Sequence, residues 1–404
     1  MIEPDFAQSL LRTYGSPLYA YDLDEVARRA QTLRAVLPAG ATVLYSLKAN
    51  PLPALVRAVK EQGCGAEVSS DGELHAALEG GADPAGLLYG GPGKTSAEVT
   101  AAVAAGVRYF SCESWLDVGR VDAVARDAGV RVQVLLRINP SVPPQARLAM
   151  TGVASQFGFE EEALVRASVP DLRATDLVGV HVYYGTQMTA DTLVATTASA
   201  FEAAERVAAT LGFTCRIVDA GGGFPWPYAN AGTGPDLGFL KEPFAELASR
   251  HPLARSSALW FESGRYLSAA SGTLLATVVD VKESKGKQFV VLDTGINHLG
   301  GMSGLGRIAR TSITVIALAG GAETTATVDV VGPLCSPLDS LGRGIAVPSL
   351  RPGDAVAIPN VGAYGLSASL IGFLSHRPPT EVAFRGGRVA AAARLRSGHE
   401  PVSL

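Results

Sequence analysis

The residue of this sequence best suited to covalent chemistry is Lys48, at the end of a short apolar run. It lies within residues 45–50, Tyr-Ser-Leu-Lys-Ala-Asn, between an apolar pair and a proline, so we expect a buried strand that ends in a loop. Burial lowers the pKa of an ammonium group, and the neutral amine is a nucleophile toward a carbonyl carbon. The alternative is a strand-end lysine whose charged head lies in water.

Two further groups of residues suit a ligand that carries both a phosphate and a cationic ring. Gly221, Gly222 and Gly223 follow a predicted strand, where backbone N–H groups can converge on a phosphate, although a glycine run can also be a tight turn. Glu262 and Arg265 offer a carboxylate for a pyridinium nitrogen and a guanidinium for the phosphate. The alternative for Glu262 is an ordinary salt bridge to Arg265 or Arg137. Together with a lysine that forms an imine, these groups describe a pyridoxal 5'-phosphate (PLP) site.

These residues need a scaffold, and the sequence predicts a (β/α)8 TIM barrel. A strand over residues 17–22 and a helix over 23–37 precede a regular alternation of apolar strands and alanine-rich helices. Eight such units in one run favour a closed parallel barrel over an open sheet. The candidate polar residues fall at the carboxyl ends of the strands, where barrels of this kind build their active sites. The predicted strands are residues 42–47, 66–69, 86–89, 107–111, 132–138, 177–183, 216–219 and 258–261.

Beyond Arg265 the pattern changes to β-branched runs separated by Gly, Asp and Pro. We predict a C-terminal antiparallel β-barrel or sandwich that shares the strand at residues 17–22. The predicted runs are residues 277–281, 289–293, 312–317, 325–331 and 355–358. The expected domains are therefore an N-terminal segment (1–28) that joins the β domain, the PLP-binding barrel (29–265) and the β domain (266–404).

Composition narrows the class of ligand and the compartment. The chain of 404 residues has a formal net charge of −4, which predicts no nucleic-acid or membrane partner and favours a small-molecule substrate. Its four cysteines are far apart, so we expect no metal site, no disulfide framework and a reducing, cytoplasmic location. Residues 355–376 are uncharged, yet Pro, Asn and Gly interrupt them, so we expect buried β structure and loop there.

Taken in order along the chain, these motifs resemble the barrel-type PLP decarboxylases that include diaminopimelate and ornithine decarboxylases. The resemblance runs from about residue 17 to about residue 389. It implies that Lys48 is the lysine that forms the imine, that Glu262 contacts the pyridine nitrogen, and that the three glycines bind the phosphate. It also implies further cofactor contacts from Tyr183, Thr186, Gly264, Arg265 and Tyr364.

The segment Gly-Pro-Leu-Cys at residues 332–335 resembles the one that brings a cysteine into the neighbouring subunit's site. The resemblance therefore implies that Cys335 is catalytic and that the protein is a homodimer with shared active sites; the alternative is an inert buried thiol. Substrate contacts are expected from Arg265, Ser336, Asp339 and Tyr364. Asp339 could instead form a turn after Pro337, and Tyr364 could be a core aromatic.

Three departures from the family pattern fall in the part of the site that selects the substrate. Tyr183 stands where the family usually has a histidine stacked on the cofactor, although a tyrosine can stack as well. Ser336 replaces the acidic residue that binds the distal ammonium. Where the diaminopimelate enzymes have an arginine and a tyrosine that hold the substrate, this chain has Gly300, Gly301 and Met302 and, further on, Leu305. Because a buried charge that loses its partner costs several kcal/mol, free diaminopimelate and ornithine should bind poorly.

We therefore predict a PLP-dependent amino-acid decarboxylase with an altered substrate pocket. The expected substrate is an L-amino acid whose far end is neutral or extended, either free or tethered to a carrier protein. The segment at residues 335–339 and Tyr183 look most similar to the branch that decarboxylates glutamyl-carrier thioesters in secondary metabolism. The alternatives are diaminopimelate decarboxylase proper, an amino-acid racemase on the same barrel, and a non-catalytic PLP carrier, which usually lacks the β domain.

Overall fold

The structure is a computed structural model that describes residues 2–139, 148–149, 154–165, 169–300, 313–318, 325–396, 398–399 and 401. The chain divides into two compact units. The barrel unit contains Ala27–Pro225 and Pro235–Leu267, and the β unit contains Met1–Val26, Trp226–Gly234 and Ser268–Leu404. The short segment Trp226–Gly234 thus leaves the barrel unit and returns to it, which the order of predicted elements does not indicate.

The barrel unit is built on eight parallel strands that close on themselves, because β5 pairs with both β4 and β6. Each of the eight predicted strands is present, so the predicted TIM barrel is confirmed. The short strand β8 (Phe159–Glu160) adds to the edge of β6. The barrel strands are β2 (Thr42–Ser46), β3 (Gly65–Val68), β4 (Leu88–Tyr89), β5 (Tyr109–Cys112), β6 (Val132–Asn139), β9 (Thr175–Val182), β11 (Ile217–Asp219) and β12 (Ala258–Ser263).

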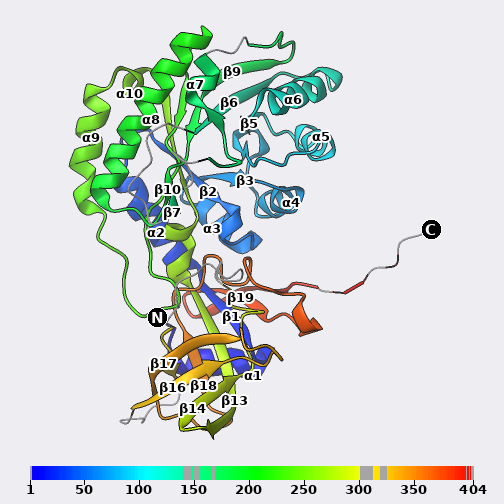
Figure 1. Cartoon of the computed structure of the whole chain (residues 1–404), viewed down its shortest axis with the longest axis vertical. Helices are drawn as coiled ribbons and strands as arrows, with labels where there is room; N and C mark the ends of the chain where they lie inside the picture. Colours follow the sequence, from blue (N-terminus) through cyan, green and yellow to red (C-terminus); the bar gives the residue numbers. More distant parts are fainter. Residues whose placement is uncertain are drawn as a thin grey trace. The chain divides into compact units, whose positions relative to one another are not determined.

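Helices form the outer layer of the barrel (Figure 1). Several begin at a side-chain cap that the sequence supplies: Ser70, Thr95, Ser114 and Thr189 each accept a hydrogen bond from a backbone N–H in the first turn. The helices are α2 (Leu23–Val36), α3 (Pro53–Lys60), α4 (Asp71–Glu79), α5 (Ser96–Ala104), α6 (Trp115–Asp127), α7 (Glu161–Val165), α8 (Ala190–Leu211), α9 (Lys241–Arg250), α10 (Pro252–Ser256) and α11 (Arg265–Ser268), with 3-10 turns η1 (Leu47–Ala49), η2 (Pro84–Gly86) and η3 (Gly238–Leu240).

An apolar layer fills part of the barrel interior, with one buried side chain from each of six strands. Burying a side chain of this size contributes about 1.5–3 kcal/mol. The layer leaves the carboxyl ends of the strands to polar residues, which is where the candidate site lies. Its members are Leu44, Leu88, Leu135, Val178, Ile217 and Trp260.

The β unit contains a mixed sheet in which the N-terminal strand takes part. Strand β1 (Leu18–Asp22) pairs antiparallel with β13 and parallel with β19, and β14 pairs parallel with β16, so two strand pairs differ from the antiparallel arrangement predicted for this domain. The remaining pairs are antiparallel. The strands are β13 (Gly272–Ser284), β14 (Lys287–Leu292), β15 (Ile316–Ala317), β16 (Thr325–Val331), β17 (Ser340–Pro348), β18 (Ala355–Ile358), β19 (Thr380–Arg385) and β20 (Arg388–Arg394).

The sequence patterns do not predict three strands of this unit, β17, β19 and β20. Gly342 and Gly344 interrupt β17, and β20 contains a run of alanines that favours helix. The unit also contains α1 (Pro4–Tyr14), η4 (Ala269–Ser271) and η5 (Phe373–Ser375). Residue 312 of the predicted run 312–317 lies outside the described residues. In the part of the chain that the structure describes, no helix is both long and apolar enough to cross a membrane.

Candidate active site

Lys48 lies in the 3-10 turn η1, two residues beyond the end of β2. Its Nζ is 3.4 Å from Glu67 Oε2 and lies over the ring of Tyr183, 5.7 Å from the ring centroid. The side chain of Lys48 is 43% exposed, as in the alternative of a strand-end lysine whose head reaches water, and its role in covalent chemistry stays a prediction. The strand holds the amine at the barrel mouth, between a carboxylate and an aromatic face.

The glycine triplet follows β11 and lies where the backbone leaves no room for a side chain. A Cβ on Gly222 would be 2.0 Å from the carbonyl oxygen of Glu262, and one on Gly221 would be 2.6 Å from that of Val182. Gly221 and Gly223 also have φ angles of +66° and +103°, which L-residues with a side chain rarely adopt. The three glycines therefore let this turn pass directly against the ends of the neighbouring strands.

Glu262 is buried near the end of β12, with Oε1 3.3 Å from Nε2 of His181. Among the described residues, neither Oε1 of Glu262 nor Oγ of Ser263 has a hydrogen-bond partner. Burial, and then the Glu262 carboxylate, raise the pKa of the fully buried Asp219 well above its usual range. Two carboxyl groups thus share this end of the barrel, and one Glu262 oxygen faces a buried imidazole.

The alternative salt bridge between Glu262 and Arg137 is not formed. Arg137 Nη1 instead lies 2.9 Å from Glu113 Oε1, in a buried pair. The other Glu113 oxygen accepts a hydrogen bond from the N–H of Gly158 at 2.9 Å. The Arg137–Glu113 pair therefore fixes the backbone at Gly158, directly before β8.

The remaining predicted residues of the barrel unit also lie beyond strand ends. Tyr183 follows β9, Thr186 is in β10 (Gly185–Thr186), and both are half-buried. Gly264 packs against the lysine turn, since a Cβ there would be 2.6 Å from the Cβ of Ala49. Arg265 is half-buried at the start of α11.

Four predicted site residues belong to the β unit. Cys335 is exposed and Ser336 is half-buried. Asp339 is buried, and its two carboxylate oxygens each accept a backbone N–H at 2.8 Å, from Ile296 and Leu334. These contacts match the turn-forming alternative for Asp339, and a contact with substrate stays a prediction.

Tyr364, the fourth, is half-buried and has a φ angle of +59°. A left-handed conformation costs a residue other than glycine about 1–2 kcal/mol, and such strain concentrates at functional positions. The substrate-selecting positions Gly301, Met302 and Leu305 lie outside the described residues, whereas Gly300 donates its N–H to Ser369 Oγ at 2.6 Å.

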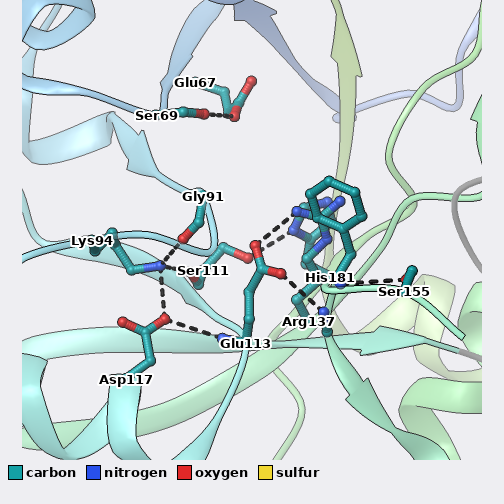
Figure 2. Close-up of polar contacts among 12 residues, drawn as sticks. Glu67, Ser69, Gly91, Lys94, Ser111, Glu113, Asp117, Arg137, Ser155 and His181 are labelled. Carbon is teal, nitrogen blue, oxygen red and sulfur yellow. Dashed lines mark hydrogen bonds and ion pairs between the residues drawn. The ribbon is translucent and has the colours of Figure 1, made fainter.

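The structure adds residues that the sequence motifs did not single out for the site. Glu67 is the carboxylate beside Lys48, and the Oγ of Ser111 lies 2.7 Å from Nδ1 of His181. Figure 2 shows His181 and Ser111 beside the Glu113 and Arg137 pair. Each of these residues interrupts or ends an apolar strand, and a polar residue within such a strand is the signal that could have identified them.

The residues present fit PLP. Lys48 supplies an amine at the barrel mouth, the glycine turn forms a cradle that any Cβ would fill, and Glu262 offers a buried carboxylate of which Oε1 faces His181. The donor atoms of His181, Asp219 and Glu262 lie within 4.8 Å of one another and could also hold a metal ion. The nearby lysine and glycine turn favour the organic cofactor, because a metal site requires neither.

Comparisons with known proteins agree with this chemistry. The pyridoxal binding domain of the pyridoxal-dependent decarboxylases matches residues 23–269. The L-glutamyl-(BtrI acyl-carrier protein) decarboxylase of Niallia circulans is 32% identical over 389 residues, which are 94% of this chain and 91% of that protein. The diaminopimelate decarboxylase of Helicobacter pylori strain J99 is 29% identical over 366 residues, which are 89% of this chain and 88% of that protein.

A solved structure shows the same fold. The crystal structure of Helicobacter pylori diaminopimelate decarboxylase complexed with L-lysine aligns with a TM-score of 0.84 at 24% identity, over 97% of this chain and 96% of that chain. The match to the pyridoxal binding domain and the two sequence relatives indicate one family. The chain belongs to the pyridoxal-dependent decarboxylases, related to diaminopimelate decarboxylase, and is an amino-acid decarboxylase whose cofactor is PLP.

Proposed function

We propose that this decarboxylase acts on an amino acid tethered to an acyl carrier protein, with a glutamyl group as the first candidate. The relative from Niallia circulans bears such a substrate in its name and aligns over nearly the full length of both chains. Ser336 supports the proposal, since a serine cannot neutralise the distal ammonium of a free diamino acid. Diaminopimelate itself is the second candidate, because several relatives carry that activity in their names.

Each residue of the barrel unit has a proposed role toward the cofactor. Lys48 would hold it covalently through Nζ, and Glu262 would keep a proton on its ring nitrogen. When bound, the protonated pyridine ring accepts the electron pair that is left as carbon dioxide departs. The face of the ring would lie on Tyr183, which already contacts the lysine head. The proposed phosphate contacts from this unit are Thr186, Gly221, Gly222, Gly223, Gly264 and Arg265, and Tyr364 is the proposed phosphate contact from the β unit.

The remaining roles concern the substrate and a second subunit. Cys335 would return a proton to the carbon that lost carbon dioxide, and its exposed position in the β unit is consistent with entry into a partner's site. Ser336, Asp339, Arg265 and Tyr364 would contact the substrate. We propose a homodimer, and a cytoplasmic location in which the four free cysteines stay reduced.

The observation that carries the chemistry is the position of Lys48 at the barrel mouth, in the same unit as the glycine cradle and the buried Glu262. We predict that borohydride fixes PLP to the peptide that contains Lys48, and that Lys48→Ala abolishes both this adduct and carbon dioxide release. Lys60→Ala, at an exposed lysine of α3, is the matched control and should keep both. Mass spectrometry of the digested protein checks the site, and an adduct elsewhere would refute the role of Lys48.

The substrate proposal is tested by carbon dioxide release from carrier-loaded glutamate, free glutamate, ornithine and meso-diaminopimelate. We expect turnover of the loaded carrier to exceed that of every free amino acid by at least about tenfold in kcat/KM, which corresponds to about 1.4 kcal/mol. Lys48→Ala serves as the blank. Efficient turnover of meso-diaminopimelate would favour the second candidate and would overturn the argument from Ser336.

A further inference from the structure

Three polar side chains from different strands form a buried line across the barrel. Ser111 on β5 contacts His181 on β9, with Oγ 2.7 Å from Nδ1, and His181 Nε2 faces Glu262 Oε1 on β12 at 3.3 Å. Each of the three residues is at most 5% exposed. The carbonyl oxygen of Ser111 also accepts a hydrogen bond from Lys94 Nζ at 2.8 Å, which fixes β5 at this point.

The contacts of His181 determine where its ring proton lies. If Nδ1 carried the proton, the lone pair of Nε2 would face Oε1 of the Glu262 carboxylate. The two lone pairs would repel each other, and water does not reach these atoms to separate them. If both nitrogens were protonated, the imidazolium would be buried; burial, followed by the charge of Arg137, lowers the pKa of His181 well below its usual range. The neutral ring with the proton on Nε2 satisfies both sides, since Ser111 then donates to Nδ1 and Nε2–H points to Glu262.

Nε2 and Oε1 are slightly farther apart than the usual hydrogen-bond range of about 2.7–3.2 Å. Neither atom has a hydrogen-bond partner among the described residues, so within this part of the chain each faces mainly the other. Asp219 makes no such contact: its Oδ1 accepts the N–H of Gly221 at 2.9 Å, and its Oδ2 has no hydrogen-bond partner among the described residues. The imidazole is therefore the group that can orient one oxygen of Glu262 and leave the other for a ligand.

We propose that His181 is a positioning residue for Glu262 and that Ser111 sets the tautomer in which it acts. The inference rests on the proposed role of Glu262 toward the cofactor ring. An N–H donated to Oε1 stabilises the carboxylate as an anion and fixes its rotamer. His181 touches neither substrate nor reacting atoms in this role, and its effect passes through Glu262.

The tautomer is measured directly on the protein without cofactor, by nitrogen NMR of histidine labelled with nitrogen-15. The His181 signals are assigned by their loss in His181→Gln. We expect the pattern of a neutral ring protonated at Nε2, and a shift toward the other tautomer in Ser111→Ala but not in Ser111→Thr, which keeps the hydroxyl. A proton on Nδ1, or a charged ring, in the wild-type protein would overturn the inference. Stoichiometric zinc in elemental analysis of the purified protein would also overturn it.

Two isosteric variants separate a positioning role from a packing role. Gln places its amide N–H near the position of Nε2, whereas Asn places an oxygen near Nδ1 and offers nothing to Glu262. We expect His181→Asn to weaken PLP binding by the apoprotein, measured by equilibrium dialysis, by about 10- to 150-fold, the usual value of a hydrogen bond to a charged group. His181→Gln should recover most of that affinity.

Equal affinities in the two variants, with equal unfolding midpoints, would refute the positioning role. This failure is distinct from failure of the proposed function, because borohydride labelling of Lys48 would still succeed in both variants. If neither wild-type nor variant protein takes up PLP at Lys48, the proposed function fails, and with it this inference.

Discussion

At the residue scale, the site depends on charges that are buried in pairs. Lys94 Nζ lies 2.8 Å from Asp117 Oδ2, and the two side chains are 1% and 5% exposed. We predict that Lys94→Met destabilises the protein by about 1–3 kcal/mol, because the buried carboxylate of Asp117 loses its nearer cation and keeps only Arg120, whose Nη1 is 3.5 Å from Oδ1. Adding Asp117→Asn removes that charge but keeps an acceptor for the N–H of Glu113, and should restore most of the loss. Urea unfolding measures the stability of the single and the double variant. A double variant no more stable than Lys94→Met would show that the loss does not come from the charge of Asp117.

A buried carboxyl group of the β unit makes stability depend on pH. Glu381 accepts a hydrogen bond from the hydroxyl of Tyr21 at 3.0 Å, and burial raises the pKa of its carboxyl group from the ordinary 4.5 to about 7. The folded state favours the protonated form of Glu381. Its contribution to the free energy of unfolding is therefore complete below about pH 4.5 and is lost as the pH rises through about 7. Glu381→Gln should therefore unfold at higher urea than wild type at pH 8, with a weaker dependence on pH between 5 and 8. An unchanged dependence would contradict the assignment.

At the element scale, the turn after β11 functions through its lack of side chains. We predict that Gly222→Ala, whose Cβ would meet the Glu262 carbonyl oxygen at 2.0 Å, displaces the turn at a cost of about 1–3 kcal/mol. If the turn binds the phosphate, PLP affinity should fall by roughly 5- to 150-fold, as equilibrium dialysis measures. Gly119→Ala in α6, where a Cβ meets nothing within 4 Å, is the control and should keep affinity while gaining up to about 1 kcal/mol of stability. Equal affinities would show that the turn does not bind the ligand.

At the scale of the whole molecule, Cys335 and Lys48 belong to different units of the chain. If each active site takes its lysine from one subunit and its cysteine from the other, mixing Lys48→Ala and Cys335→Ala chains should restore about a quarter of wild-type activity. Half of the random dimers are then hybrids, and each hybrid has one intact site. Mixing Lys48→Ala with Glu262→Gln is the control, since both residues belong to the barrel unit and no intact site can form. No recovery in purified Lys48→Ala and Cys335→Ala hybrids would refute shared sites.

The sequence by itself determined the barrel and much of its candidate site. Strand positions and the places where strands end follow from apolar periodicity and from Gly and Pro, which are local signals. Because the carboxyl ends of parallel barrel strands meet at one face, Lys48, the glycine triplet and Glu262 could be assigned to one face before their contacts were known. The roles of Cys335 and Tyr364 came from resemblance to the family, since neither residue has a local pattern that predicts them.

Only the tertiary structure decided which side chains meet. Ser111, His181 and Glu262 are far apart in sequence, and their contacts depend on how the strands of the closed barrel are staggered. β20 is a strand despite its alanines because it pairs with β19, which in turn pairs with the distant β1. Contacts between residues far apart in sequence also place Trp226–Gly234 in the β unit. Local propensity carries no information about such partners, because the free energy that favours them comes from burial and hydrogen bonds that exist only after the chain has folded.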